Sequence, residues 1–100
     1  MAEQPPDFLA HRDGDSVAVA VRHLQAGPAQ GAYLDSPGTL RLTVSSDVPL
    51  GHKVALVDIE QGADVIEYGV RVGVASQAIS AGDYVHVHNV RSARWHSSVA

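Results

Sequence analysis

The 100-residue sequence contains no cysteine, which excludes disulfide bridges, thiolate metal sites and thiol nucleophiles. It is also poor in cations: 7 Lys and Arg stand against 11 Asp and Glu, so the net charge of -4 argues against a nucleic-acid partner. No apolar run approaches the roughly 20 residues that span a bilayer, and the first residues do not resemble a signal peptide. We therefore expect a cytoplasmic protein that is not attached to a membrane, in which any metal is held by imidazoles and carboxylates.

Sustained helical periodicity is missing as well, whereas short β-branched segments alternate with turns about every 8 to 12 residues. This pattern predicts an all-β fold, a compact barrel or sandwich with at most short helical turns. The expected strands cover residues 17–21, 40–44, 53–57, 64–68, 70–75 and 83–88. Residues 1–14 are predicted to be a flexible N-terminal arm, residues 28–38 a loop and residues 93–100 a C-terminal tail, around a single domain at 15–92. A chain of this size cannot enclose a deep cavity alone, so a partner chain is plausible.

An internal repeat supports a fold made of strand–turn units. Ile59-x-x-Gly62-x-x-Val65 recurs twenty positions later as Ile79-x-x-Gly82-x-x-Val85, and the segment 24–27 offers a weaker copy. Each copy combines an apolar anchor with a glycine that can adopt positive φ, which lets one strand turn into the next.

Histidines provide the candidate site. His86 and His88 alternate within an expected strand, so they should share one face and serve as metal ligands or in proton transfer; alternatively they are ordinary strand histidines. His52 and Lys53 follow Gly51 at the mouth of another strand. His52 is the candidate catalytic acid or base, and Lys53 is the candidate ligand of a substrate carboxylate. The alternatives are an ordinary turn residue for His52 and a solvated lysine for Lys53.

Other polar residues near the C-terminus have two interpretations each. Asn89 could hydrogen-bond a substrate hydroxyl or merely end a strand, and Arg91, with Arg94, could bind a carboxylate or be solvated. The remaining candidates are read without a catalytic role. Three histidines, His11, His23 and His96, are expected at the surface, and Trp95 is expected to pack on the barrel or on a partner subunit.

Several of these segments, in order and spacing, carry a resemblance to a known family. They are Gly51-His52-Lys53-Val54-Ala55, Asp58-Ile59-x-x-Gly62, Val65-Ile66-x-Tyr68-Gly69, Gly73-x-Ala75 and Ile79-x-x-Gly82-x-x-Val85-His86-Val87-His88-Asn89. Over residues 15–92 the chain resembles the SAF domain of altronate and galactarate dehydratases. The resemblance implies a β-clip fold. It also implies metal-dependent removal of water from sugar acids or, as in a related two-subunit enzyme, of sulfite from sulfolactate.

In that family the small domain is either fused ahead of a larger catalytic region or forms a separate small subunit. The resemblance therefore predicts the small subunit of a sugar-acid dehydratase or lyase. Such a subunit would be inactive without a larger partner, and the complete enzyme would use divalent iron or manganese; assembly of several copies is also compatible. The alternatives are a non-catalytic SAF module that binds a sugar acid or docks a protein, and a structural domain without a ligand.

Overall fold

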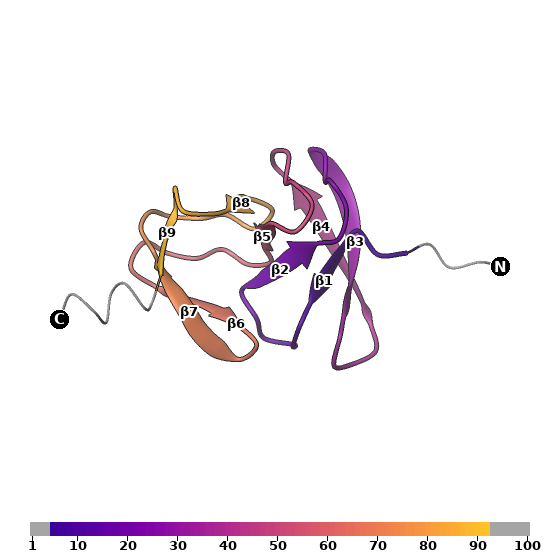
Figure 1. Cartoon of the computed structure of the whole chain (residues 1–100), viewed down its shortest axis with the longest axis horizontal. Helices are drawn as coiled ribbons and strands as arrows, with labels where there is room; N and C mark the ends of the chain where they lie inside the picture. Colours follow the sequence, from indigo (N-terminus) through magenta and orange to yellow (C-terminus); the bar gives the residue numbers. More distant parts are fainter. Residues whose placement is uncertain (1–4, 93–100) are drawn as a thin grey trace.

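The computed structural model describes residues 5–92, which form nine β-strands and no helix (Figure 1). The strands are β1 Phe8–Ala10, β2 Val17–Ala20, β3 Gly27–Tyr33, β4 Thr39–Val44, β5 Lys53–Ala55, β6 Asp64–Glu67, β7 Val70–Ala75, β8 Tyr84–Val85 and β9 Val90–Ser92. They make a six-stranded sheet in the order β4-β3-β1-β2-β5-β8 and a three-stranded sheet in the order β6-β7-β9. The predicted all-β class is confirmed. Within the described range no helix is long and apolar enough to cross a membrane.

Strand β1 lies in the middle of the larger sheet, antiparallel to β2 and parallel to β3. The prediction that residues 1–14 form a flexible arm is therefore wrong for this stretch. Phe8 is fully buried in the first core cluster, and its aromatic ring lies directly over Gly31 of β3. This contact with a residue distant in sequence holds the segment in the sheet. A Cβ on Gly31 would stand 2.2 Å from that ring, so the glycine makes the room that the phenylalanine fills.

The predicted loop at residues 28–38 is also wrong over most of its length. β3 pairs with β4 from Gly27–Val44 to Ala32–Thr39 in continuous antiparallel register. Glycine, alanine and proline disfavour strands in isolation, but here the strand is imposed by pairing on both sides, with β4 and with β1. The true connection is short and lies between Tyr33 and Thr39.

The internal repeat builds the junction between the two sheets. Gly62 and Gly82 have φ of +85° and +93°, and the two anchors Ile59 and Ile79 form an antiparallel bridge with each other. Both isoleucines belong to the second core cluster. Val48-x-x-Gly51-x-x-Val54 repeats the same pattern, with φ of +84° at Gly51, and was not recognised as a copy from the sequence. At Gly51, Gly62 and Gly82 alike, the glycine N–H donates to a strand carbonyl at 2.8 Å.

Candidate functional site

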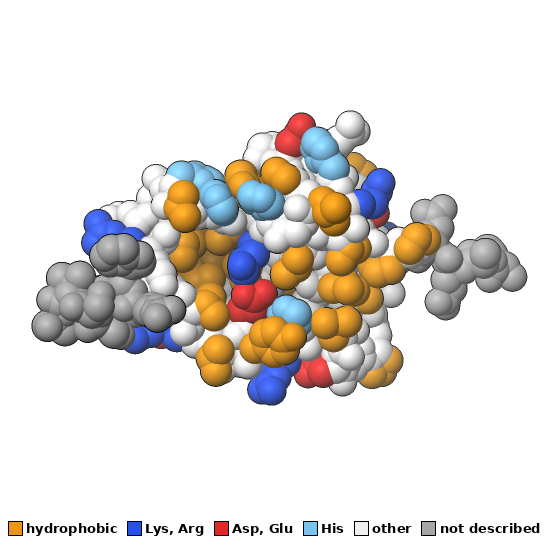
Figure 2. Space-filling view, viewed as in Figure 1, with side chains coloured by type: hydrophobic (Ala, Val, Ile, Leu, Met, Phe, Trp, Pro, Cys, Tyr) orange, Lys and Arg blue, Asp and Glu red, His pale blue; other side chains and the backbone are white. Residues whose placement is uncertain are grey.

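An open groove of about 460 Å³ lies between the β5–β8 edge of the larger sheet and the smaller sheet. Its lining comprises Gly51, His52, Lys53, Val65, Glu67, Val72, Val85, His86, Val87, Val90 and Ser92. Figure 2 shows histidine side chains gathered at one edge of a hollow with hydrophobic side chains, where one basic and one acidic side chain lie together. The groove thus combines an apolar floor with a few polar groups, as small-molecule sites commonly do.

His52 reaches the groove because of the turn that precedes it. Gly51 takes positive φ, and the His52 N–H donates to the Pro49 carbonyl at 3.0 Å, which closes the turn just before β5. The imidazole is half-buried, and its Nδ1 lies 2.6 Å from the hydroxyl of Tyr84 on the neighbouring strand β8. The predicted position of His52 at the mouth of a strand is confirmed.

The two C-terminal histidines do not lie on a strand, contrary to the prediction. The strand ends at Val85, and residues 86–89 form a tight turn in which the Asn89 N–H donates to the His86 carbonyl at 3.1 Å. His86 turns into the groove, with its ring centroid 4.9 Å from that of His52. His88 is exposed and is not part of the groove lining, although its ring centroid lies 5.5 Å from that of Tyr84.

Asn89 makes this turn. Its side chain is buried; Oδ1 accepts the His86 N–H at 2.9 Å and Nδ2 donates to the Tyr84 carbonyl at 2.8 Å. Side-chain bonds of this kind are a common way for asparagine to stabilise a turn. The placement favours the backbone interpretation over substrate binding, and it assigns Asn89 the task of directing His86.

Lys53 meets a carboxylate that the sequence analysis did not single out. Its Nζ lies 3.8 Å from Glu67 Oε1, and the other carboxylate oxygen, Oε2, lies 3.4 Å from His11 Nε2. His11 is stacked on Tyr68 with ring centroids 3.7 Å apart, and its side chain is only 16% exposed, so the prediction of a surface histidine is wrong here. The alternation of Glu67 with Val65 along β6 was the signal for a groove-facing residue.

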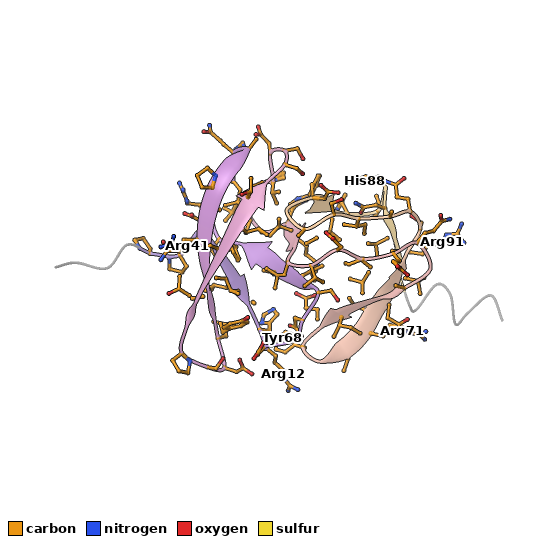
Figure 3. The ribbon with its side chains drawn as sticks, turned by 180° about the vertical axis from the view of Figure 1, so that it is seen from behind. Arg12, Arg41, Tyr68, Arg71, His88 and Arg91 are labelled. Atoms are coloured by element: carbon orange, nitrogen blue, oxygen red, sulfur yellow. The ribbon has the colours of Figure 1, made fainter. Side chains whose placement is uncertain are left out.

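Arg91 is not brought together with the histidines. Its neighbours Val90 and Ser92 line the groove, so the alternation of β9 directs Arg91 to the opposite side. Figure 3 shows Arg91 at the end of the molecule, apart from His88. His23 is exposed and pairs with Asp47 at 3.3 Å, which confirms its surface prediction. The predictions for Arg94, Trp95 and His96 lie outside the described residues.

Tyr84 lies at the centre of the site and contacts three histidine rings. It packs against the first core cluster, and its ring centroid lies 5.6 Å from that of His52, 5.6 Å from that of His86 and 5.5 Å from that of His88. Strand pairing places Tyr84 opposite Val54 and so near His52, a contact for which the local sequence carries no signal.

A metal ion would need more ligands than these residues supply. A metal site requires three or more protein donors in most cases, and across residues 5–92 no group of three His, Cys, Asp or Glu side chains is placed to hold one. His52 Nδ1 is already engaged by Tyr84. The described residues therefore do not form a metal centre by themselves, and the groove offers the Lys53 ammonium, two imidazoles and the Glu67 carboxylate over an apolar floor.

Comparison with known proteins identifies the relatives of this chain. The altronate/galactarate dehydratase SAF domain model matches residues 6–93. The chain is 40% identical over 91 residues to (2R)-sulfolactate sulfo-lyase subunit alpha of Chromohalobacter salexigens, covering 89% of this chain and 97% of the relative.

Two altronate dehydratases are also similar. The Bacillus subtilis protein is 35% identical over 85% of this chain and the Escherichia coli protein 45% identical over 78%, but the matches cover only 16% and 15% of those relatives. The chain thus spans nearly all of one relative and about a sixth of the others. These names describe lyases and dehydratases, not hydrolases.

Proposed function

This chain belongs to the SAF-domain family of altronate and galactarate dehydratases, and we propose that it is the small subunit of a two-chain lyase that eliminates water or sulfite from a 2-hydroxy acid. One observation carries the proposal. His52, Lys53 and His86 line a single open groove in a chain that aligns with 97% of a sulfo-lyase subunit alpha.

The donors of the groove suit this reaction. Elimination removes a proton beside a carboxylate, so negative charge grows on the carboxylate oxygens as the C–H bond breaks, and preorganised N–H donors lower its free energy. The Lys53 ammonium and the His52 imidazole are the groups in place to receive that carboxylate. Glu67 holds the ammonium at the groove.

The larger chain would complete the site. Two apolar side chains at the groove are strongly exposed, Val87 of its lining at 81% and Leu50, which precedes Gly51, at 65%, and a larger chain seated there would bury both. The family resemblance predicts divalent iron or manganese in the complete enzyme. Because the described side chains do not cluster three ligands, further ligands would have to come from that larger chain.

The test first searches the neighbouring reading frames of the source genome for a large dehydratase-like chain, and then assays this chain alone and together with that candidate partner. Turnover of altronate, galactarate and sulfolactate is followed with manganese or ferrous iron present. We expect negligible turnover by either chain alone and measurable turnover by the pair. The turnover of the pair should fall at least about 10-fold in Lys53→Gln and stay unchanged in the matched surface variant Arg41→Gln. Calorimetric binding of an acid to the isolated chain, with no turnover by the pair, would instead support a binding module.

A further inference from the structure

We infer that Tyr84 fixes His52 in the tautomer that carries its hydrogen on Nε2, so that neutral His52 enters the groove as a hydrogen-bond donor and not as a base. The inference starts from the 2.6 Å contact between His52 Nδ1 and the Tyr84 hydroxyl. One of these two atoms must donate to the other, and the direction decides which ring nitrogen keeps the hydrogen.

Two features favour donation by the hydroxyl. A phenol O–H is a better donor than a neutral imidazole N–H, and a pyridine-type imidazole nitrogen is a better acceptor than a phenol oxygen. In addition, His52 Nδ1 is the one hydrogen-bond partner of this hydroxyl among residues 5–92. Were the hydroxyl to accept, its own hydrogen would have no protein partner in that range.

The hydroxyl is also held in place. Tyr84 packs its ring against the first core cluster, and its carbonyl accepts the Asn89 amide at 2.8 Å. Its backbone pairs with Val54 of β5, the strand that His52 precedes. Ring and backbone are therefore fixed from two sides, and the geometry of the contact does not depend on a mobile side chain.

The consequence concerns the reaction proposed above, on which this part of the inference rests. With Nδ1 occupied and a hydrogen on Nε2, neutral His52 has no free lone pair to take the proton of a substrate. It can donate a hydrogen bond to an oxygen that gains negative charge, beside the Lys53 ammonium. The base that removes the proton must then be another group, either His86 of the same groove or a residue of the larger chain. Tyr84 is a positioning residue and His52 the catalytic residue that touches the substrate.

Nitrogen NMR of the isolated full chain tests the tautomer without any enzyme activity. In ¹⁵N-labelled protein at a pH where the ring is neutral, the His52 signals, assigned by their loss in His52→Gln, should show a pyrrole-type Nε2 and a pyridine-type Nδ1. In Tyr84→Phe both shifts should move toward intermediate values as the tautomers interconvert. Tyr33→Phe, which removes a hydroxyl from another tyrosine packed on the same core cluster, should change neither. A pyrrole-type Nδ1, or unchanged shifts in Tyr84→Phe, would overturn the inference.

The assembled pair separates the donor from the base. If His52 donates, His52→Gln retains an N–H donor and should keep at least roughly 10-fold more activity than His52→Leu, with Tyr84→Phe roughly 10-fold below wild type in kcat. Equal inactivity of the two His52 variants would support a base and contradict the donor role. A wild-type pair without turnover would count against the proposed function alone, since the NMR result stands independently.

Discussion

Replacing Gly82 by alanine should destabilise the protein far more than the same change at Gly62, although the two glycines occupy equivalent positions of the repeat. Both have positive φ, +93° and +85°, so alanine at either position carries a backbone strain of about 1–2 kcal/mol. The surroundings differ. A Cβ at Gly82 would stand 2.0 Å from the Thr43 carbonyl oxygen, whereas a Cβ at Gly62 has nothing within 4 Å.

The extra cost at Gly82 follows from what must move. The Thr43 carbonyl belongs to β4 and would have to withdraw by about 1 Å to restore even a 3.0 Å contact. That shift disturbs the Ser45 N–H, which donates to the Gly82 carbonyl at 3.0 Å, and the Ser45 hydroxyl, which donates to Asp83 at 2.7 Å. Overpacking of this kind typically costs about 1–3 kcal/mol. The expected loss is therefore about 2–5 kcal/mol for Gly82→Ala against about 1–2 kcal/mol for Gly62→Ala.

Urea unfolding followed by far-ultraviolet circular dichroism measures the difference. With a urea dependence of about 1–3 kcal/mol per molar, the Gly82 variant should unfold on the order of 1 M earlier than the Gly62 variant. A Gly82→Ala protein that does not fold agrees with the prediction. Equal midpoints for the two variants would show that strand β4 is not held against this turn and would refute the reasoning.

Three further outcomes are expected. Asn89→Ala should lower the free energy of unfolding by about 2–3 kcal/mol, because the buried side chain makes two hydrogen bonds that alanine cannot make. His88→Ala, at an exposed position, should change it by less than about 0.5 kcal/mol, and equal urea midpoints for the two variants would contradict this. Asp15→Ala should lower the free energy of unfolding by about 2–3 kcal/mol, since the buried carboxylate accepts hydrogen bonds from the N–H groups of Tyr68 at 2.9 Å and Gly69 at 3.0 Å. These bonds hold Tyr68 at φ +60°, and an unchanged Tm in thermal unfolding would argue against this role of Asp15. Glu67→Gln should raise KM of the assembled pair for its acid substrate several-fold through loss of the carboxylate that holds Lys53, and an unchanged KM would remove that role.

Several features of the fold could be predicted from sequence because they depend on local patterning. The 70–75 strand and the start of the 53–57 strand follow from alternation of apolar residues, and the repeated isoleucine–glycine–valine spacing marked the turns that lead into β6 and β8. His52 was placed correctly because a glycine with positive φ acts on the next residue along the chain.

Two errors fall where partners distant in sequence decide the structure, and a third is local. Phe8 and the glycine-rich β3 have weak strand signals of their own, and each becomes a strand by packing on the other. The expected strand at 83–88 stops at Val85 because Asn89 bonds back to residue 86, a contact that the alternation of histidines conceals.

The sequence by itself determined the all-β class, the turn glycines and the presence of imidazoles and a lysine in motifs of one family, since these depend on residue type and short spacing. Only the tertiary structure decided which of these side chains meet. His11 and Lys53 converge on the carboxylate of Glu67, and Tyr84 contacts His52 from the neighbouring strand. Arg91 points to the other side of the smaller sheet. Such contacts depend on strand pairing over long sequence separation, which no local pattern specifies.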